Sequence, residues 1–183
     1  LGLRPDTCAH SYSYWIPDHH HEAHPDWFAL VGGKRIRQKE GGQLCLANAE
    51  MREEFTAHIL RYHAEHPEVS IVGICANDGY GWCECDECLA LDTEKDRAEG
   101  TVNGRMADFV QDICERVRTE RPGIMLGNYS YSNHADFHLV RPEPLPENLT
   151  LSCTLFRCLR HRISDPTCPR NAPLFARVKE LRS

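Results

Sequence analysis

Short apolar runs alternate with amphipathic helical segments along most of this chain, and this alternation restricts the fold more than any other feature. The runs are QLCLA (43–47), VSIVGICA (69–76), IMLGNYS (124–130) and LTLSCTL (149–155). They are short and rich in apolar and β-branched residues, as is typical of strands buried on both faces. We therefore expect four strands that lie parallel and adjacent in one sheet.

Helical segments separate these runs. The first begins at Asn48, a favourable N-cap residue, and ends before Pro67. The second spans 102–123 and carries an apolar stripe at helical spacing, made of Val102, Met106, Phe109, Ile113 and Val117. A last helix is expected at 172–183. Buried strands that alternate with helices predict an α/β fold in which the helices cover a parallel sheet.

Two architectures satisfy this pattern: an open doubly wound sheet and a (β/α)8 TIM barrel. A complete TIM barrel needs eight strands and typically about 250 residues. The chain has 183 residues, in which only the four runs above are clear. We therefore expect a single domain over 1–183 that is a partial (β/α)8 barrel.

Charge and hydropathy argue against several function classes. The formal net charge is −6 and no sustained basic run occurs, so the sequence favours neither a nucleic-acid partner nor an anionic membrane surface. No apolar stretch is long enough to span a bilayer. The chain begins LGLRPDTCAH without an initiator Met, and we expect it to have been processed or cut from a longer protein. The sequons at Asn128 and Asn148 matter only in a eukaryotic secretory pathway.

Polar and aromatic side chains follow the predicted strands, at the carboxyl ends where α/β proteins place their sites. Asp78 is the sharpest candidate, because a carboxylate at a strand end can act as a general acid or orient a reacting group. Asn-Asp-Gly is also a turn signal, so a purely structural role for Asp78 is the alternative. An aromatic and polar surface of this kind suits sugar rings. The expected members are His10, Asn48, Asn77, Asp78, Tyr131, Arg157 and His161.

Three cysteines, Cys83, Cys85 and Cys88, lie together in the loop after the second run. Three interpretations stay open: a structural zinc site, a local disulfide, or free thiols. A catalytic redox pair would need a thioredoxin-like context that this loop lacks. Zinc usually takes four ligands, and we expect the fourth from a distant cysteine: Cys75, Cys153, Cys158 or Cys168.

Several motifs in order, CAHSYSYWIP, HPDWFALVGGKR, QLCLANAEMRE, ANDGYGWCECDECLAL and FRCLRHRISDPTCPRN, resemble the family known as domain of unknown function 4838. Its members are similar to TIM-barrel glycoside hydrolases of the α-glucuronidase and hexosaminidase kind, and relatives include endo-β-N-acetylglucosaminidases. The resemblance implies a secreted or periplasmic barrel domain that acts on glycans. No cofactor is required for such hydrolysis, and the remainder of the barrel lies outside this chain.

The resemblance also implies roles for single residues. Asp78 would be a catalytic carboxylate on the active-site face. Glycoside hydrolysis normally needs a second carboxyl group, and independently of the resemblance we expect Glu84 to supply it; Asp86 and Glu87 of the same loop, or a residue outside this chain, are the alternatives. Asn77 would lie beside Asp78, Tyr80 and Trp82 would wall the sugar site, and His10, Tyr131 and Arg157 would contact substituents of the sugar. The cysteines would hold the loop rigid around Asp78. The alternative from another class is a non-catalytic carbohydrate-binding or zinc-stabilised interaction module, which would have no paired carboxylates.

Overall fold

The computed structural model describes residues 9–140, 144–153, 158, 160–162 and 164–180. The chain forms two compact units, Leu1–Ser152 and Cys153–Ser183, and each is described by itself. The first unit contains almost all regular structure. The second contains α6 (Asn171–Glu180), which confirms the predicted last helix with a start one residue earlier.

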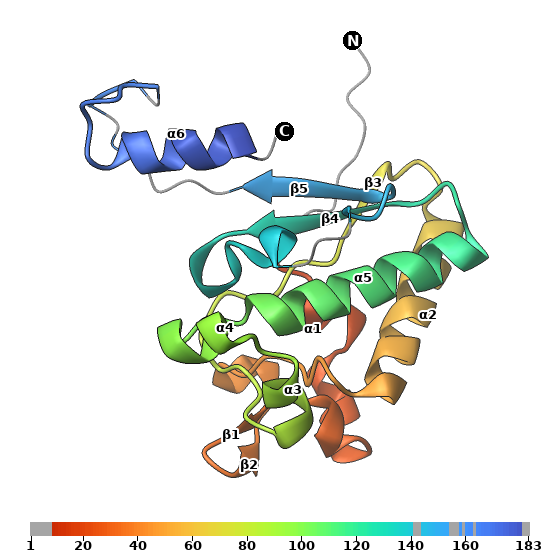
Figure 1. The fold of residues 1–183 in the computed structure, drawn as a ribbon. Helices are drawn as coiled ribbons and strands as arrows, with labels where there is room; N and C mark the ends of the chain where they lie inside the picture. The colour runs from red at the N-terminus through yellow and green to blue at the C-terminus, as the bar shows by residue number, and fades with distance from the viewer. Residues whose placement is uncertain (1–8, 141–143, 154–157, 159, 163, 181–183) are drawn as a thin grey trace. The chain divides into compact units, whose positions relative to one another are not determined.

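A parallel sheet forms the centre of the first unit. Its strands β3 (Ile71–Gly73), β4 (Met125–Ser130) and β5 (Leu149–Cys153) are hydrogen-bonded in chain order and run in the same direction (Figure 1). Ile71 pairs with Met125 and Gly73 with Gly127. His10, on a segment that precedes β3 in the chain, forms a parallel β-bridge with Cys75, which follows β3. Three of the four expected strands are therefore confirmed as parallel neighbours.

The two long helices form as the sequence predicts. Helix α2 (Ala49–Glu65) begins at Asn48, whose side-chain oxygen accepts a hydrogen bond from the Met51 backbone N–H at 2.8 Å. Helix α5 (Asn103–Glu120) buries its whole predicted apolar stripe. The Asp96 carboxylate accepts hydrogen bonds from the backbone N–H groups of Asn103 and Gly104, which satisfies donors at the start of α5.

One core joins these helices to the sheet. Helices α2 and α5 pack together on one side of β3 and β4 (Figure 1). The short helix α1 (Tyr12–Trp15) inserts two aromatic rings into the same core, and Trp15 Nε1 donates a 2.7 Å hydrogen bond to the Gly73 carbonyl of β3. The packing of these rings fixes the segment before β3 against the sheet.

The segment 43–47 is not a strand of this sheet, so the prediction of a fourth strand there is wrong. Its backbone pairs with 27–29 instead, through an antiparallel bridge between Phe28 and Leu44. Side chains still alternate as in a strand: Leu44 and Leu46 lie in the main core, whereas Cys45 lies in a separate buried cluster. The segment thus divides two cores, which is why it is apolar without belonging to the sheet.

Short elements connect these parts. A hairpin of β1 (Leu30–Val31) and β2 (Lys34–Arg35) lies next to the second core, with α3 (Asp86–Ala90) and α4 (Glu94–Glu99) following the cysteine loop. The single-turn 3-10 helices are η1 (Asp18–Glu22), η2 (Pro25–Trp27), η3 (Gln38–Glu40), η4 (Ser132–His134) and η5 (Phe137–Leu139).

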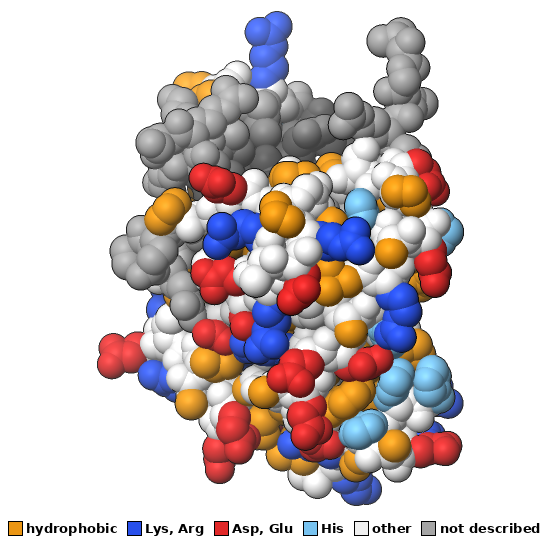
Figure 2. Space-filling view, turned by 90° about the vertical axis from the view of Figure 1, so that its right-hand side faces the viewer, with side chains coloured by type: hydrophobic (Ala, Val, Ile, Leu, Met, Phe, Trp, Pro, Cys, Tyr) orange, Lys and Arg blue, Asp and Glu red, His pale blue; other side chains and the backbone are white. Residues whose placement is uncertain are grey.

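The α/β class is therefore confirmed. Among the described residues, β3, β4 and β5 form an open parallel sheet, β1 and β2 form a separate hairpin, and no closed barrel is present. Within the described residues, no helix is both long enough and apolar enough to cross a membrane. Acidic and basic side chains are interspersed on the face shown in Figure 2. Ion pairs such as Arg52–Asp108, at 2.7 Å, join α2 to α5.

Candidate functional site

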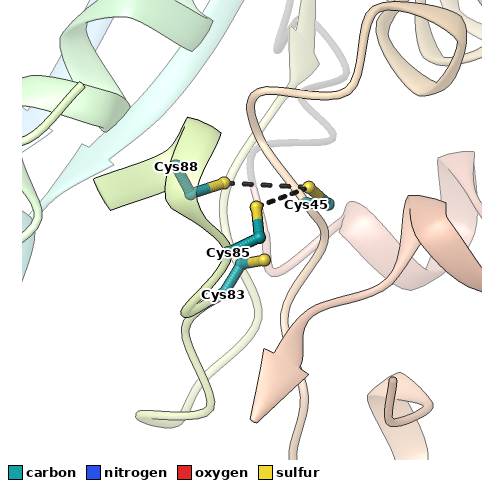
Figure 3. A group of neighbouring side chains, drawn as sticks. All are labelled: Cys45, Cys83, Cys85 and Cys88. Atoms are coloured by element: carbon teal, nitrogen blue, oxygen red, sulfur yellow. Dashed lines mark hydrogen bonds between the residues drawn. The ribbon is translucent and has the colours of Figure 1, made fainter. Parts of the chain in front are cut away.

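Four cysteine thiols meet in the second core of the first unit. They are Cys45, Cys83, Cys85 and Cys88, all buried and all free, with sulfur atoms within 4.8 Å of one another (Figure 3). Cys45 Sγ lies 3.6 Å from Cys85 Sγ and 3.8 Å from Cys88 Sγ. The expectation that Cys85 and Cys88 lie close together with a further sulfur is confirmed. The fourth cysteine is Cys45. The prediction that Cys75, Cys153, Cys158 or Cys168 completes the group is therefore wrong.

Close backbone contact brings the two cysteine segments together. Gly42 and Gly81 form a parallel bridge, and the Gln43 N–H donates to the Gly81 carbonyl at 2.8 Å. A Cβ atom at position 81 would lie 2.2 Å from the Gly41 carbonyl oxygen, so only glycine permits this approach. The chain then presents Cys83 and Cys85, and α3 turns Cys88 back towards them.

Donors surround Cys83 and favour its thiolate form. The Leu30 backbone N–H donates to Cys83 Sγ at 3.3 Å, and the Arg35 guanidinium lies 3.6 Å from the same sulfur. Hydrogen bonds from the Cys45 and Cys88 thiols hold the pKa of Cys83 below its usual range. Burial raises the pKa of Cys85, so in the metal-free protein the cluster shares its charge unequally.

A buried ion pair supports the loop from outside. Arg105 of α5 donates to both carboxylate oxygens of Asp92 and also to the Cys83 carbonyl. Both partners are almost fully buried, with side-chain exposures of 3% and 5%. Removal of one partner would leave the other charge uncompensated, so this pair couples the cysteine loop to the main core.

The spacing of the sulfur atoms suits tetrahedral coordination. Four thiolates at about 2.3 Å from a central metal ion would be about 3.8 Å apart. The Cys45 separations of 3.6 and 3.8 Å match this edge length. The buried four-cysteine group therefore has the ligand set and the spacing of a site that could hold a metal ion.

A second candidate surface lies where β3 and β4 end. Tyr131 follows β4 directly, and its hydroxyl donates to Asp78 Oδ1 at 3.2 Å. His10 stands beside the same group, with ring centroids 6.0 Å from Tyr131 and 5.7 Å from Tyr129. Burial and the nearby Asp78 raise the pKa of Tyr131 to about 12, so the hydroxyl stays protonated and donates. The structure therefore brings together Asp78, Tyr131 and His10.

Two buried polar atoms border this surface without a hydrogen-bond partner among the described residues. They are Trp82 Nε1 and His134 Nε2. The His134 ring lies 5.0 Å from the Tyr131 ring and 5.7 Å from the Trp82 ring. Buried donors and acceptors are normally satisfied. A buried water is the usual partner of such atoms. Tyr80 is 77% exposed nearby, and its hydroxyl accepts a 3.3 Å hydrogen bond from Ser132.

Other residues predicted for the site have structural partners. Asn48 caps α2, and its amide also donates to Asp26 at 2.8 Å. Asn77 exchanges hydrogen bonds with the side chains of Gln38 and Gln43. These contacts hold the loop that carries Asp78, so Asn77 stabilises the position of Asp78.

Glu84 points to the hairpin. Its carboxylate accepts a 2.8 Å hydrogen bond from the Gly32 backbone N–H, and its own N–H donates to Leu30 at 2.7 Å. A role as second carboxylate stays a prediction. His161 belongs to the second unit, where it contacts Cys158, and Arg157 lies outside the described residues.

Sequence reasoning missed Cys45 and Arg35, whereas His134 was expected near the surface because it follows the run 124–130. Cys45 sits between Leu44 and Leu46, and this apolar context hides a ligand. The alternation of side chains along an extended segment was the available signal. Cys45 points to the opposite side from Leu44 and Leu46, so it can lie in a different core. Arg35 reaches Cys83 only through tertiary packing.

Comparison with known proteins agrees with the resemblance seen in the sequence motifs. No curated protein and no solved structure matches the chain. One family model, described as a domain of unknown function, matches residues 2–141. This match covers well over half of the chain, so the chain belongs to the family of domain of unknown function 4838 (DUF4838).

Proposed function

We propose that this chain is part of a glycoside-hydrolase-like (β/α)-barrel domain that binds a glycan at the Asp78–Tyr131 surface. One observation carries the proposal: the Asp78 carboxylate and the Tyr131 hydroxyl, which follow two adjacent parallel strands, meet at 3.2 Å. Sites of α/β proteins lie at this end of the sheet. The resemblance of the family to glycoside hydrolases supports the same location.

The chemistry of the surface suits a sugar. Tyr80, Tyr129 and Tyr131 offer aromatic faces, and His10 and Asp78 offer hydrogen-bonding edges. We propose N-acetylglucosamine-containing or uronic-acid-containing glycans as the substrate class, with Asp78 in carboxylate acid/base chemistry.

The second carboxylate separates hydrolysis from binding alone. Glycoside hydrolysis normally needs two carboxyl groups. Glu84 is engaged by the hairpin turn, so residues of the remaining barrel are the stronger source of a partner. Without that partner, the chain would act as a carbohydrate-binding module.

Calorimetric titration with oligosaccharides of the two classes, combined with product detection, tests the proposal on the full-length protein. We expect Asp78→Asn to lower turnover about 100-fold or more while the fold is kept. Tyr131→Phe should weaken glycan binding about tenfold, because Asp78 loses the hydrogen bond that orients its carboxylate. Glu120→Gln, an exposed change at the end of α5, is the matched control.

The outcomes are distinct. Binding without turnover, weakened by both variants, would assign a non-catalytic module. Wild-type protein that binds no glycan of either class, or Asp78 and Tyr131 variants that behave like Glu120→Gln, would contradict the glycan proposal.

We also propose that the ion held by the four cysteines is zinc, in a structural role. Four thiolates in a closed, buried arrangement are a typical structural zinc site. In the secreted or periplasmic compartment that we propose for this family member, ligation would also protect adjacent thiols from oxidation. The ion would hold the loop before α3 against the segment of Cys45, close to Trp82 and Asp78.

Removal of one ligand tests this centre. Cys45→Ser is expected to reduce the zinc content by one equivalent per chain relative to wild type, as measured by elemental analysis of the purified protein. Cys114→Ala is the control, because Cys114 is buried on α5 outside the cluster. Equal zinc contents in Cys45→Ser and wild type would refute a zinc centre at these residues.

A further inference from the structure

A second group of metal-ligating side chains lies in the second unit, outside the segment matched by the family model. Cys158, His161 and Cys168 bring two sulfur atoms and one ring nitrogen within 4.8 Å of one another. Cys158 Sγ lies 3.2 Å from His161 Nδ1. A zinc ion with sulfur at about 2.3 Å and nitrogen at about 2.0 Å would place such ligands roughly 3.5–3.8 Å apart.

One buried side chain organises the loop that carries these ligands. Asn171, fully buried at the start of α6, accepts a 2.8 Å hydrogen bond from the Cys158 N–H. Its amide donates to the carbonyls of Cys158, His161 and Arg162 at 3.0–3.2 Å. All four contacts of this side chain therefore go to the backbone around the first two ligands.

The third ligand is positioned by a local turn. The Asp165 carboxylate accepts hydrogen bonds from the Thr167 N–H at 2.9 Å and the Thr167 hydroxyl at 2.7 Å. This arrangement is an Asx turn. The Cys168 N–H then donates to the Asp165 carbonyl, and the Cys168 carbonyl accepts from the Ala172 N–H at 3.0 Å. The backbone at all three ligands is thus preorganised by protein contacts.

We propose that Cys158, His161 and Cys168 form a second metal site that takes zinc or a similarly soft ion and leaves one coordination position open. Two thiolates and an imidazole select such ions over magnesium or calcium. His161 is exposed and Cys158 half-buried, so solvent reaches the ion from one side. Three protein ligands with an open fourth position are the arrangement in which zinc binds water or a further ligand. The four-cysteine group, in contrast, is closed and buried.

Metal stoichiometry of the intact chain tests this site. Native mass spectrometry of the reduced, zinc-loaded protein should show two equivalents for wild type and one for Cys158→Ser and for His161→Ala. The exposed His19→Ala is the matched control and should keep both. Because Cys45→Ser removes the other equivalent, the two sites are counted separately, and glycan binding enters neither measurement.

Cobalt substitution reports the ligands directly. The charge-transfer absorption from thiolate to cobalt grows with the number of thiolate ligands. In a Cys158→Ser, Cys168→Ser double variant it should be lower than in wild type by the contribution of the two missing thiolates. Asn171→Ala keeps all three ligands but loses the hydrogen bonds that hold their backbone in place. We expect its zinc affinity at this site to fall at least tenfold. Near-ultraviolet circular dichroism confirms that each variant is folded.

Two results would overturn the proposal. One is that wild type binds a single equivalent of zinc and that the His161→Ala variant still binds this equivalent. The other is a Cys158–Cys168 disulfide, detected as a mass loss of two hydrogens in protein kept with zinc and without reductant.

Discussion

At the residue scale, burial decides which polar side chains do chemistry and which support the fold. Asn128 and Asn148 match glycosylation sequons, yet both are buried. The Asn148 amide donates to the Cys114 carbonyl at 3.0 Å. Neither side chain is accessible to a glycosylating enzyme in the folded protein. His134, in contrast, is buried beside the Asp78–Tyr131 surface with one nitrogen unpaired among the described residues.

His134 predicts a pH dependence of stability. Burial, assisted by nearby His10, lowers its pKa to about 4 from 6.5. Between these values the unfolded chain binds the proton more readily, so stability is fully present above pH 6.5 and falls as the pH drops towards 4. We expect this group to account for about 3 kcal/mol across the window.

Urea unfolding at pH 7 and pH 4.5 measures this effect. His134→Gln should reduce the loss of stability between the two pH values, whereas the exposed His19→Gln should leave it as in wild type. An unchanged pH dependence in His134→Gln would mean that His134 titrates normally in the folded state.

At the scale of elements, the cysteine centre depends on how closely two loops approach. Segments 41–45 and 81–88 contribute one and three cysteines, and the Gly42–Gly81 bridge sets their distance. The hairpin β1–β2 contributes the Leu30 N–H and the Arg35 guanidinium to Cys83. The centre is thus assembled from three segments, none of which holds it alone.

Gly81→Ala tests this assembly. The new Cβ would meet the Gly41 carbonyl oxygen at 2.2 Å, so the loops must separate. We expect a loss of about 1–3 kcal/mol in unfolding free energy, as for other overpacked sites. Zinc affinity should fall with it, because the sulfur atoms move apart.

Gly123→Ala is the matched control, since no atom lies within 4 Å of its ideal Cβ position. Competition with a chromophoric chelator measures the affinity of both variants. Wild-type affinity and stability in Gly81→Ala would show that the loops tolerate a wider spacing and that the bridge is not what places the cysteines.

At the scale of the whole molecule, the first unit contains two cores that share few residues. The larger core joins the sheet to α2 and α5, and the smaller core is largely the four cysteines. The buried Arg105–Asp92 pair links them through the Cys83 carbonyl. A core built mainly of thiols has little apolar surface to stabilise it, so we expect its order to depend on the ion that we propose there.

Metal removal should therefore destabilise the protein. At a free zinc concentration of 1,000 times Kd, binding contributes about 4 kcal/mol. Chelation should then lower Tm by roughly 10 °C for a chain of this size. Differential scanning calorimetry with and without chelator measures the shift, and added zinc, unlike magnesium, should restore it. A protein stripped of metal that melts at the original temperature would show that the four cysteines need no ion.

The sequence by itself determined the elements that depend on local pattern. Helix α2 follows from its Asn48 cap and apolar periodicity, and α5 from its apolar periodicity. Strands β3, β4 and β5 follow from short runs that are apolar enough to be buried. Asp78 and Tyr131 were predictable as neighbours, because residues after adjacent parallel strands reach the same edge of a sheet.

Some segments have no regular pattern that predicts which part of the chain they pair with. For these, only the tertiary structure decided the pairing. QLCLA has the composition of a strand, yet its backbone pairs with 27–29, because packing divides Leu44 and Leu46 from Cys45. The fourth cysteine of the cluster lies 38 residues before Cys83 in the numbering of the chain, and no local rule joins them. Such contacts arise from loop closure across the whole unit, where the free energy of burial, rather than sequence proximity, selects the partner.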